Sequence, residues 1–137
     1  MSLVLDSSVA LAWVYIEERS AAIAAVFDQI TEAGAWVPSL WRLEVANVLE
    51  MGVRRGRNDA AFRDATLADF ELLPIQSDSE TLKHAWRSTL RLAERHRLTV
   101  YDAAYLELAM RRGLPLASLD RDLRAAAAAE NVALLGE

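Results

Sequence analysis

The chain opens with Met1-Ser2-Leu3-Val4-Leu5-Asp6-Ser7-Ser8, a stretch that predicts a strand, a turn and the start of a helix. Leu3–Leu5 is the apolar strand, and an apolar helical pattern follows over Val9–Val14. Asp6 then stands at the carboxyl end of the first strand, which is the edge where open α/β sheets bind ligands. The later acidic residues of interest are those that could reach Asp6.

Short apolar strands alternate with helical patterns along the rest of the chain. The predicted strands are residues 3–5, 35–37, 72–75, 114–118 and 132–135. The predicted helices are residues 9–15, 17–33, 39–53, 58–70, 78–96, 99–112 and 121–130, with Ser7 or Ser8, Ser39, Asn58 and Thr99 as N-caps. The helix over 78–96 is the most clearly amphipathic, with a predicted buried face of Leu82, Ala85, Trp86, Thr89, Leu90 and Ala93. This alternation predicts a parallel sheet with helices on both faces.

Composition favours a globular protein. At 137 residues, with 53% hydrophobic and 26% charged residues, the chain fits a single domain over residues 1–137 with a substantial core. The absence of cysteine excludes disulfides, thiolate metal sites and cysteine nucleophiles. The amino terminus has no basic region before its apolar run, and no stretch is long enough to cross a membrane, so we expect a cytoplasmic protein.

The net charge of −5 argues weakly against nucleic acid, because phosphate binders usually carry a basic surface. Much of that charge is neutralised if several carboxylates hold divalent metal. The basic residues are nearly all arginine, with Lys83 the only lysine, and arginine suits bidentate phosphate contacts. A GC-rich genome would give the same bias.

Four acidic residues are distinguished by their positions. Asp6 and Asp120 follow the first and fourth strands, which are expected neighbours at the switch point of a doubly wound sheet. Asp102 lies in the first turn of the helix that precedes strand four. Glu44 lies in an apolar stripe of the helix 39–53, where an uncompensated carboxylate is costly, and Asn47 follows one turn later.

Each of these acids also fits a purely structural role. Asp120 could cap a helix, Asp102 could belong to a capping box, Asp6 could be a turn residue, and Glu44 could pair with Arg42 or face solvent. Together, however, converging carboxylates repel and need a cation to coexist. Oxygen ligands without cysteine or a well-placed histidine select hard ions, so Mg²⁺ or Mn²⁺ is expected and zinc is not.

The sequence resembles a PIN domain, and closely the VapC-type toxins of bacterial toxin–antitoxin pairs. The resemblance spans the whole chain in family order and rests on four segments: Leu3-Val4-Leu5-Asp6-Ser7-Ser8, Pro38-Ser39-Leu40-Trp41-Arg42-Leu43-Glu44-Val45-Ala46-Asn47-Val48-Leu49, Leu98-Thr99-Val100-Tyr101-Asp102-Ala103-Ala104-Tyr105-Leu106-Glu107-Leu108-Ala109 and Leu116-Ala117-Ser118-Leu119-Asp120.

The resemblance implies a three-layer α/β/α fold whose five-stranded parallel sheet has the order 3-2-1-4-5. It places the family's acidic metal cluster on Asp6, Glu44, Asp102 and Asp120. The family's small hydroxyl after the first acid falls on Ser8, and its serine or threonine before the last acid falls on Ser118, where threonine is commoner. Asn47 and Asp122 are expected to support the site from nearby, although Asp122 also suits the first turn of a helix.

The implied activity is a Mg²⁺-dependent endoribonuclease in which metal-activated water attacks an RNA phosphodiester. The implied partners are an RNA substrate, an antitoxin protein that blocks the site, and a second copy of the chain in a homodimer. Trp13 and Trp41 could line the antitoxin groove, and both also suit a core. Two alternatives stay open: an RNA-processing PIN nuclease outside toxin–antitoxin pairs, and a non-catalytic PIN-like module that only binds proteins.

Overall fold

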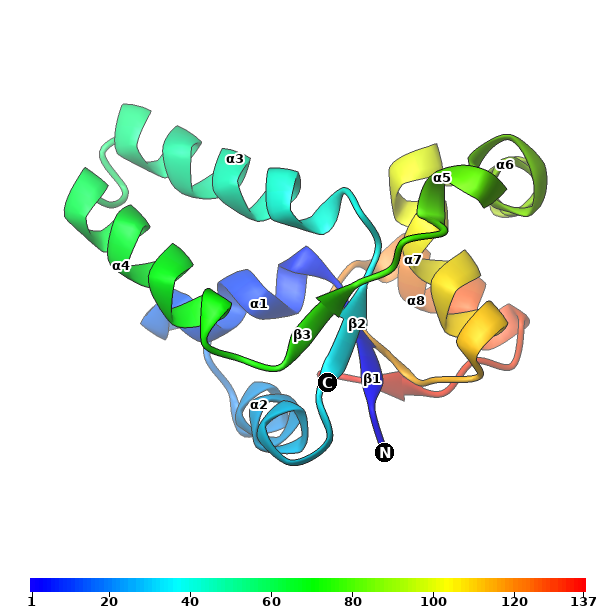
Figure 1. The fold of residues 1–137 in the computed structure, drawn as a ribbon, viewed down its shortest axis with the longest axis horizontal. Helices are drawn as coiled ribbons and strands as arrows, with labels where there is room; N and C mark the ends of the chain where they lie inside the picture. The colour runs from blue at the N-terminus through cyan, green and yellow to red at the C-terminus, as the bar shows by residue number, and fades with distance from the viewer.

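A five-stranded, all-parallel sheet runs through the centre of the protein in the order β3-β2-β1-β4-β5 (Figure 1). The computed structural model describes residues 1–137. The strands are β1 (Leu3–Leu5), β2 (Ala35–Val37), β3 (Ile75–Ser77), β4 (Leu116–Ala117) and β5 (Leu134–Leu135). This order is the one expected, and β1 at its centre is completely buried.

Helices cover both faces of the sheet, which confirms the three-layer α/β/α fold (Figure 1). One side carries α1 (Ser7–Val14), α2 (Ala21–Ala33), α3 (Trp41–Arg54) and α4 (Ala60–Glu71). The other side carries α5 (Thr81–His84), α6 (Leu90–His96), α7 (Val100–Arg112) and α8 (Arg121–Ala129). A 3-10 turn, η1 (Ile16–Glu18), follows α1, and a π-helical turn, η2 (Ala85–Thr89), joins α5 to α6. None of these helices has both the length and the apolar character of a membrane span.

The register of the central strands determines which side chains meet at the carboxyl edge of the sheet. Leu5 of β1 pairs with Ala117 of β4, so the next residues, Asp6 and Ser118, leave the sheet side by side. The backbone amide of Asp6 donates to the Ala117 carbonyl at 2.9 Å, which extends this pairing by one residue. The sheet therefore fixes Asp6 against the segment that leads to Asp120.

The prediction of one amphipathic helix over 78–96 is wrong. The segment is interrupted at η2, where Arg87 has φ −120° and ψ −110°, and its buried residues are Asp78, Thr81, Thr89, Leu92 and Ala93. Leu82 and Trp86, expected in the core, are 79% and 90% exposed. The wider π turn changes the phase of the helix, so apolar spacing read at 3.6 residues per turn selects the wrong face.

Several element boundaries also differ from expectation because other residues act as caps. The helix α2 begins at Ala21 rather than at residue 17, since the Ser20 hydroxyl accepts from the Ile23 amide at 3.2 Å. Asp59, not Asn58, caps α4, accepting from the Phe62 amide at 2.7 Å.

Other predicted boundaries shift at α1, α3 and the strands. Asp6 is the N-cap residue of α1, and Ser39 donates its amide to Thr81 Oγ1 at 3.1 Å while α3 starts at Trp41. The strand expected over 72–75 starts only at Ile75, after Pro74, which has no amide to donate. The last two strands are shorter than predicted, covering residues 116–117 and 134–135.

Candidate active site

Asp6 belongs to a cluster of acids at the carboxyl edge of the sheet, together with Glu44, Asp102 and Asp120; these four residues are called the acidic crevice below. The Asp6 side chain is buried, with only 4% of the residue exposed. The Ser8 and Ser118 hydroxyls both donate to Asp6 Oδ2, at 2.6 and 2.8 Å. Burial raises the pKa of Asp6 and the charge of Asp120 raises it further, while the two serine hydrogen bonds oppose this rise.

The two serines connect Asp6 to the loop that follows β4. Ser8 Oγ accepts from the Leu119 amide, and Ser118 Oγ accepts from the Asp120 amide, each at 3.0 Å. Each serine hydroxyl donates its proton to Asp6, so the loop amides can donate to the remaining lone pairs of the serine oxygens. Ser8 and Ser118 therefore hold the carboxylate of Asp6 and the backbone of Asp120 in one hydrogen-bonded unit.

Glu44 reaches the same crevice from the opposite side, on α3. Tyr105 of α7 donates its phenolic hydrogen to Glu44 Oε1. Burial raises the pKa of Glu44, and the negative charges of Asp6 and Asp102 add to the effect. The alternative pairing with Arg42 does not form, because Arg42 is directed at Glu71, 3.5 Å away.

Sequence reasoning missed Tyr105, which is fully buried and holds Glu44 in place. The spacing of Tyr105 is a signal in the sequence: it follows Asp102 by three residues, so the two side chains lie on the same face of one helix. Burial and the charges of Asp6 and Glu44 raise the pKa of Tyr105, so it remains a hydrogen-bond donor at neutral pH.

Asp102 and Asp120 are held at the N-termini of α7 and α8. The Thr99 hydroxyl accepts from the Asp102 amide at 3.1 Å and caps α7. Burial raises the pKa of Asp102 to about 6, and the charges of Asp120 and Asp6 contribute. Asp120 Oδ1 accepts from the Leu123 amide at 2.8 Å, so this carboxylate does cap a helix as well as face the crevice.

The four acids act on one another electrostatically, and none has a cationic partner in the protein. Asp6, Asp102 and Asp120 each raise the pKa of at least one other acid of the four, Glu44 being raised by Asp6 and Asp102. None of the four takes part in an ion pair with arginine, lysine or histidine. They do not form a closed ligand shell, since no three acidic or histidine side chains have the spacing of a preformed metal site. The crevice therefore concentrates negative charge that no protein cation neutralises.

The two remaining predicted residues lie at the margin of this crevice. Asp122, in the first turn of α8, is exposed, and its charge contributes to the raised pKa of Asp102. Asn47 is exposed on α3 and makes no hydrogen bond with any of the four acids. The structure thus brings Asp122 near the site and gives Asn47 no contact there.

Comparison with known proteins identifies the family. Residues 3–129 match the family model of the PIN domain. This chain belongs to the PIN-domain family. Within that family it is similar to Ribonuclease VapC3 of Pyrobaculum aerophilum, with 40% identity over 128 residues that cover 90% of this PIN domain and 92% of the relative. The resemblance to VapC-type proteins is therefore confirmed.

Solved structures confirm the fold of this PIN domain. The crystal structure of PAE2754 from Pyrobaculum aerophilum superposes with a TM-score of 0.64 at 24% identity, covering 92% of this chain and 79% of that one. FitAcB from Neisseria gonorrhoeae superposes with a TM-score of 0.65 at 17% identity, covering 98% and 96%. At these identities the match concerns the fold alone, and it extends over nearly the whole chain.

Proposed function

We propose that this PIN domain is a metal-dependent endoribonuclease that hydrolyses RNA phosphodiesters. The similarity to a protein named Ribonuclease VapC3 supports the substrate class. The observation that carries the proposal is the crevice itself, where Asp6, Glu44, Asp102 and Asp120 are linked electrostatically and none has an ion-pair partner in the protein. A nuclease that works through metal needs this arrangement, whereas a purely structural cluster would be neutralised by arginine or lysine.

The donor set fits a hard divalent ion. All four side chains offer carboxylate oxygens, which suit Mg²⁺, and Mn²⁺ substitutes with the same ligand chemistry. Bound there, the ion would lower the pKa of a water molecule and neutralise charge on the phosphate. The protein's own part is to hold the ligands: Ser8 and Ser118 orient Asp6, and Tyr105 orients Glu44.

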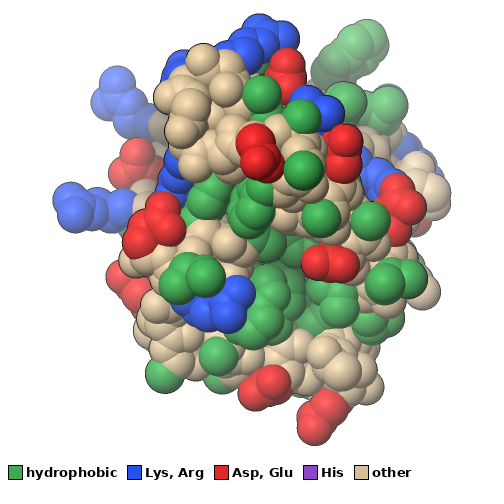
Figure 2. All heavy atoms as spheres, turned by 90° about the vertical axis from the view of Figure 1, so that its left-hand side faces the viewer, with side chains coloured by type: hydrophobic (Ala, Val, Ile, Leu, Met, Phe, Trp, Pro, Cys, Tyr) green, Lys and Arg blue, Asp and Glu red, His purple; other side chains and the backbone are tan.

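The nuclease would act as the toxin of a type II toxin–antitoxin pair, inhibited by a cognate antitoxin. The VapC-type relative supports this assignment. Figure 2 views the molecule from the side of α4 and shows hydrophobic side chains gathered in a hollow of that face, which suits a bound protein. Trp13, half-buried and stacked on Phe27 at 4.7 Å, and the buried Trp41 are the groove residues first expected.

The two alternatives make different predictions. An RNA-processing nuclease would use the same crevice without an antitoxin, and a short open reading frame for a DNA-binding protein directly upstream of the gene would argue against it. A binding module without activity would keep the fold and the partner but cleave no RNA. No feature of the structure favours the RNA-processing nuclease or the binding module over the proposed toxin.

Substitution of Asp102 tests the proposed activity. Asp102→Asn keeps the size of the side chain and removes one ligand charge, and Thr99 still caps α7. We expect cleavage of total cellular RNA, with Mg²⁺ or Mn²⁺, to fall by about a hundredfold or more while the circular dichroism spectrum stays unchanged. Asp28→Asn, an exposed residue on α2, is the matched control and should cleave like the wild type. Equal cleavage by wild type and Asp102→Asn would remove Asp102 from the site, and cleavage by neither would favour the binding module.

The homodimer would form through an apolar face beside the crevice. Leu43 of α3, Leu82 of α5 and Trp86 of η2 are all strongly exposed, and a hydrogen bond from the Ser39 amide to Thr81 Oγ1 joins the starts of α3 and α5. Exposed apolar side chains on adjoining elements are typical of protein interfaces.

Light scattering tests this dimer. The wild type should have twice the monomer mass at micromolar concentration, and a variant with Leu82→Ser and Trp86→Ser should be monomeric. Ile16→Ser removes an equally exposed apolar side chain from η1 and should leave the mass unchanged. A monomeric wild type, or a dimer that survives both substitutions, would contradict the assignment.

A further inference from the structure

Residues 81–97, which form α5, η2, α6 and the turn that follows, carry a charge opposite in sign to that of the whole chain. The protein has a net charge of −5, yet this segment holds five of its fifteen basic residues and a single acid, Glu94. Both histidines of the chain, His84 and His96, also lie here. The rest of the chain is therefore strongly acidic, and this segment is where an anionic ligand meets the least repulsion.

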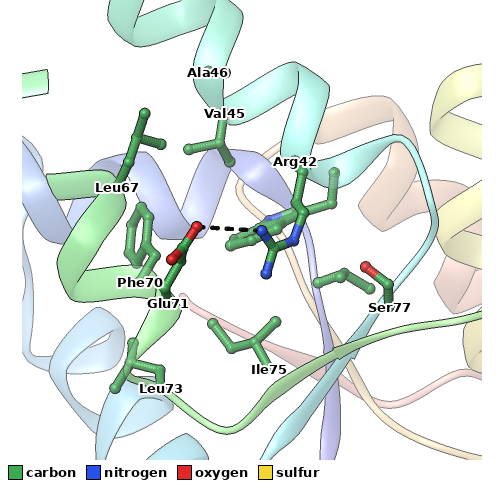
Figure 3. Close-up of a pocket in the computed structure, with 11 residues that line it drawn as sticks. Arg42, Val45, Ala46, Leu67, Phe70, Glu71, Leu73, Ile75 and Ser77 are labelled. Carbon is green, nitrogen blue, oxygen red and sulfur yellow. Dashed lines mark ion pairs between the residues drawn. The ribbon is translucent and has the colours of Figure 1, made fainter. Parts of the chain in front are cut away.

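The arginines of this segment are less occupied by protein carboxylates than those on the opposite side of the sheet. Around α3 and α4, most arginines are held in ion pairs, as Arg42 is with Glu71 at 3.5 Å (Figure 3). In residues 81–97, three exposed arginines have no ion pair in the protein: Arg87, Arg91 and Arg97. Their guanidinium groups keep all of their hydrogen-bond donors available for an acceptor outside the chain.

A groove of about 500 Å³, called the basic groove below, is formed by α5, η2, α6 and α7, which lie together on one side of the sheet (Figure 1). Only two of its eight lining residues are hydrophobic, so an apolar ligand is not favoured. Its single acid, Glu107, is neutralised from within, because Arg111 donates to both carboxylate oxygens, at 2.8 and 3.1 Å. The other polar lining residues all come from the basic segment: His84, Ser88, Arg91 and Arg95.

Two arginines of the basic groove repel each other. Arg91 and Arg95 are four residues apart on α6, so their side chains share one face of the helix. Arg95 contacts Glu130 at 2.8 Å, whereas Arg91 has no carboxylate partner. Glu130 also forms a hydrogen bond with His96 at 2.6 Å, so it keeps a partner when Arg95 turns to another anion. Guanidinium groups bind phosphate through two parallel hydrogen bonds, so a phosphate ester is the anion that suits this groove.

The helix α7 separates the basic groove from the acidic crevice. Asp102, in the first turn of α7, belongs to the crevice, whereas Glu107 and Arg111 line the groove. Because an α-helix turns about 100° per residue, Glu107 points about 140° away from Asp102 around the helix axis. The groove therefore lies beside the crevice and not within it, and a ligand held there is not at the position of the proposed cleavage.

We propose that the basic groove is a second binding site for RNA, which holds the phosphate backbone of the substrate away from the bond that is cut. The choice of RNA among polyanions rests on the proposed function. The groove supplies what the acidic crevice lacks, an attraction for RNA in a chain whose net charge is −5. Because its contacts go to phosphates, it contributes affinity and orientation but no choice of sequence. The exposed Leu82 and Trp86 do not line it, so the proposed dimer leaves it open.

Binding of RNA without cleavage tests the basic groove. The probe is a fluorescein-labelled single-stranded RNA of random sequence, titrated with the full-length protein in chelator and followed by fluorescence anisotropy. The double variant Arg91→Gln with Arg95→Gln should weaken binding by about tenfold at low salt. It should also reduce the slope of log affinity against log salt concentration by between about one and two, because two phosphate contacts are lost.

The matched control is Arg54→Gln with Arg55→Gln at the end of α3. It changes the net charge by the same amount and likewise removes one arginine that is in an ion pair, Arg54 with Glu50, and one that is not. This control should bind RNA like the wild type, because the loss of binding depends on position and not on net charge.

Cleavage kinetics separate the basic groove from the acidic crevice. With Mg²⁺ and a long RNA, the groove variant should raise KM by about tenfold and leave kcat unchanged, because the groove holds the RNA equally in the ground state and the transition state. An RNA too short to reach both sites should be cleaved alike by the wild type and the groove variant.

Circular dichroism establishes that each variant is folded before it is titrated. Binding that is unchanged in the groove variant, or weakened equally in the control, would overturn the proposal. So would displacement of the labelled RNA by AMP at an equal concentration, which would assign the groove to a small anion. A wild type that binds RNA through the groove in chelator but cleaves none with metal would contradict the proposed nuclease and leave the second site established.

Discussion

Two buried aspartates occupy equivalent places in this fold and have opposite electrostatic surroundings. Asp6 directly follows β1 and Asp78 directly follows β3, and they are 4% and 1% exposed. Asp78 receives two hydrogen bonds from Arg111, at 3.1 and 2.6 Å, one from Arg112 at 3.2 Å, and one from Thr81. Asp6 receives hydrogen bonds from the hydroxyls of Ser8 and Ser118 and has no cation.

The pKa values of Asp6 and Asp78 differ because their hydrogen-bond partners differ. Burial acts to raise the pKa of Asp78, but the hydrogen bonds from the arginines and Thr81 outweigh it and lower the pKa to about 2. At Asp6 burial prevails and the pKa is raised. Position in the sheet and burial therefore do not decide what a strand-end aspartate does. A counter-charge within the protein makes Asp78 a structural link between β3 and α7, whereas the Asp6 carboxylate has no such counter-charge.

Matched substitutions give the largest expected difference between the two aspartates. Asp78→Asn leaves Arg112 without an anion and Arg111 paired with Glu107 and Glu80 alone, and should lower the free energy of unfolding by about 3 kcal/mol. Asp6→Asn keeps an oxygen that accepts from both serines and removes repulsion, so the metal-free protein should change by less than about 1 kcal/mol, or gain stability. Urea unfolding in the presence of chelator measures both. Similar losses of stability in Asp78→Asn and Asp6→Asn would show that the different electrostatic surroundings of the two aspartates do not affect stability.

The pH dependence of stability should distinguish the acidic crevice from Asp78, with a smaller effect. Asp102, in the crevice with Asp6, has a folded pKa of about 6, above its unfolded value near 3.9, so the metal-free protein should gain stability as pH falls from about 7 to about 4. Asp78 has a folded pKa of about 2, so its contribution is present above the unfolded pKa and lost as pH falls from about 4 toward 2.

Thermal unfolding across this range, with chelator, should therefore give a maximum near pH 4. Asp102→Asn should flatten the rise above pH 4 and leave the fall below it. A wild type whose stability declines steadily from pH 7 would contradict the raised pKa of Asp102.

The sheet and the four acids were predictable because strand-end position follows directly from chain order. Once Leu3–Leu5 and Leu116–Ala117 are adjacent parallel strands, Asp6 and Asp120 must leave at the same edge. Glu44 was predictable because a carboxylate in an apolar helical stripe needs a compensating environment. The role of these acids in metal binding and catalysis remains a prediction.

The partners of the acids and the path of the chain over residues 78–96 were not predictable. Tyr105 is an ordinary core residue by composition, and only three-dimensional packing directs its hydroxyl at Glu44. The break at η2 was not visible because a pattern read at 3.6 residues per turn assumes one unbroken helix, whereas the chain widens to a π turn and has non-helical angles at Arg87.

The central claim is that the acidic crevice holds a divalent cation because the protein provides none. Titration with Mn²⁺, followed by the electron paramagnetic resonance signal of the free ion, tests it without RNA and without any assumption about activity. At neutral pH the wild type and the control Asp28→Asn should bind Mn²⁺, and Asp6→Asn should lose most of that binding while remaining folded. Equal binding by Asp6→Asn, or no binding by the folded wild type at millimolar Mn²⁺, would contradict the account.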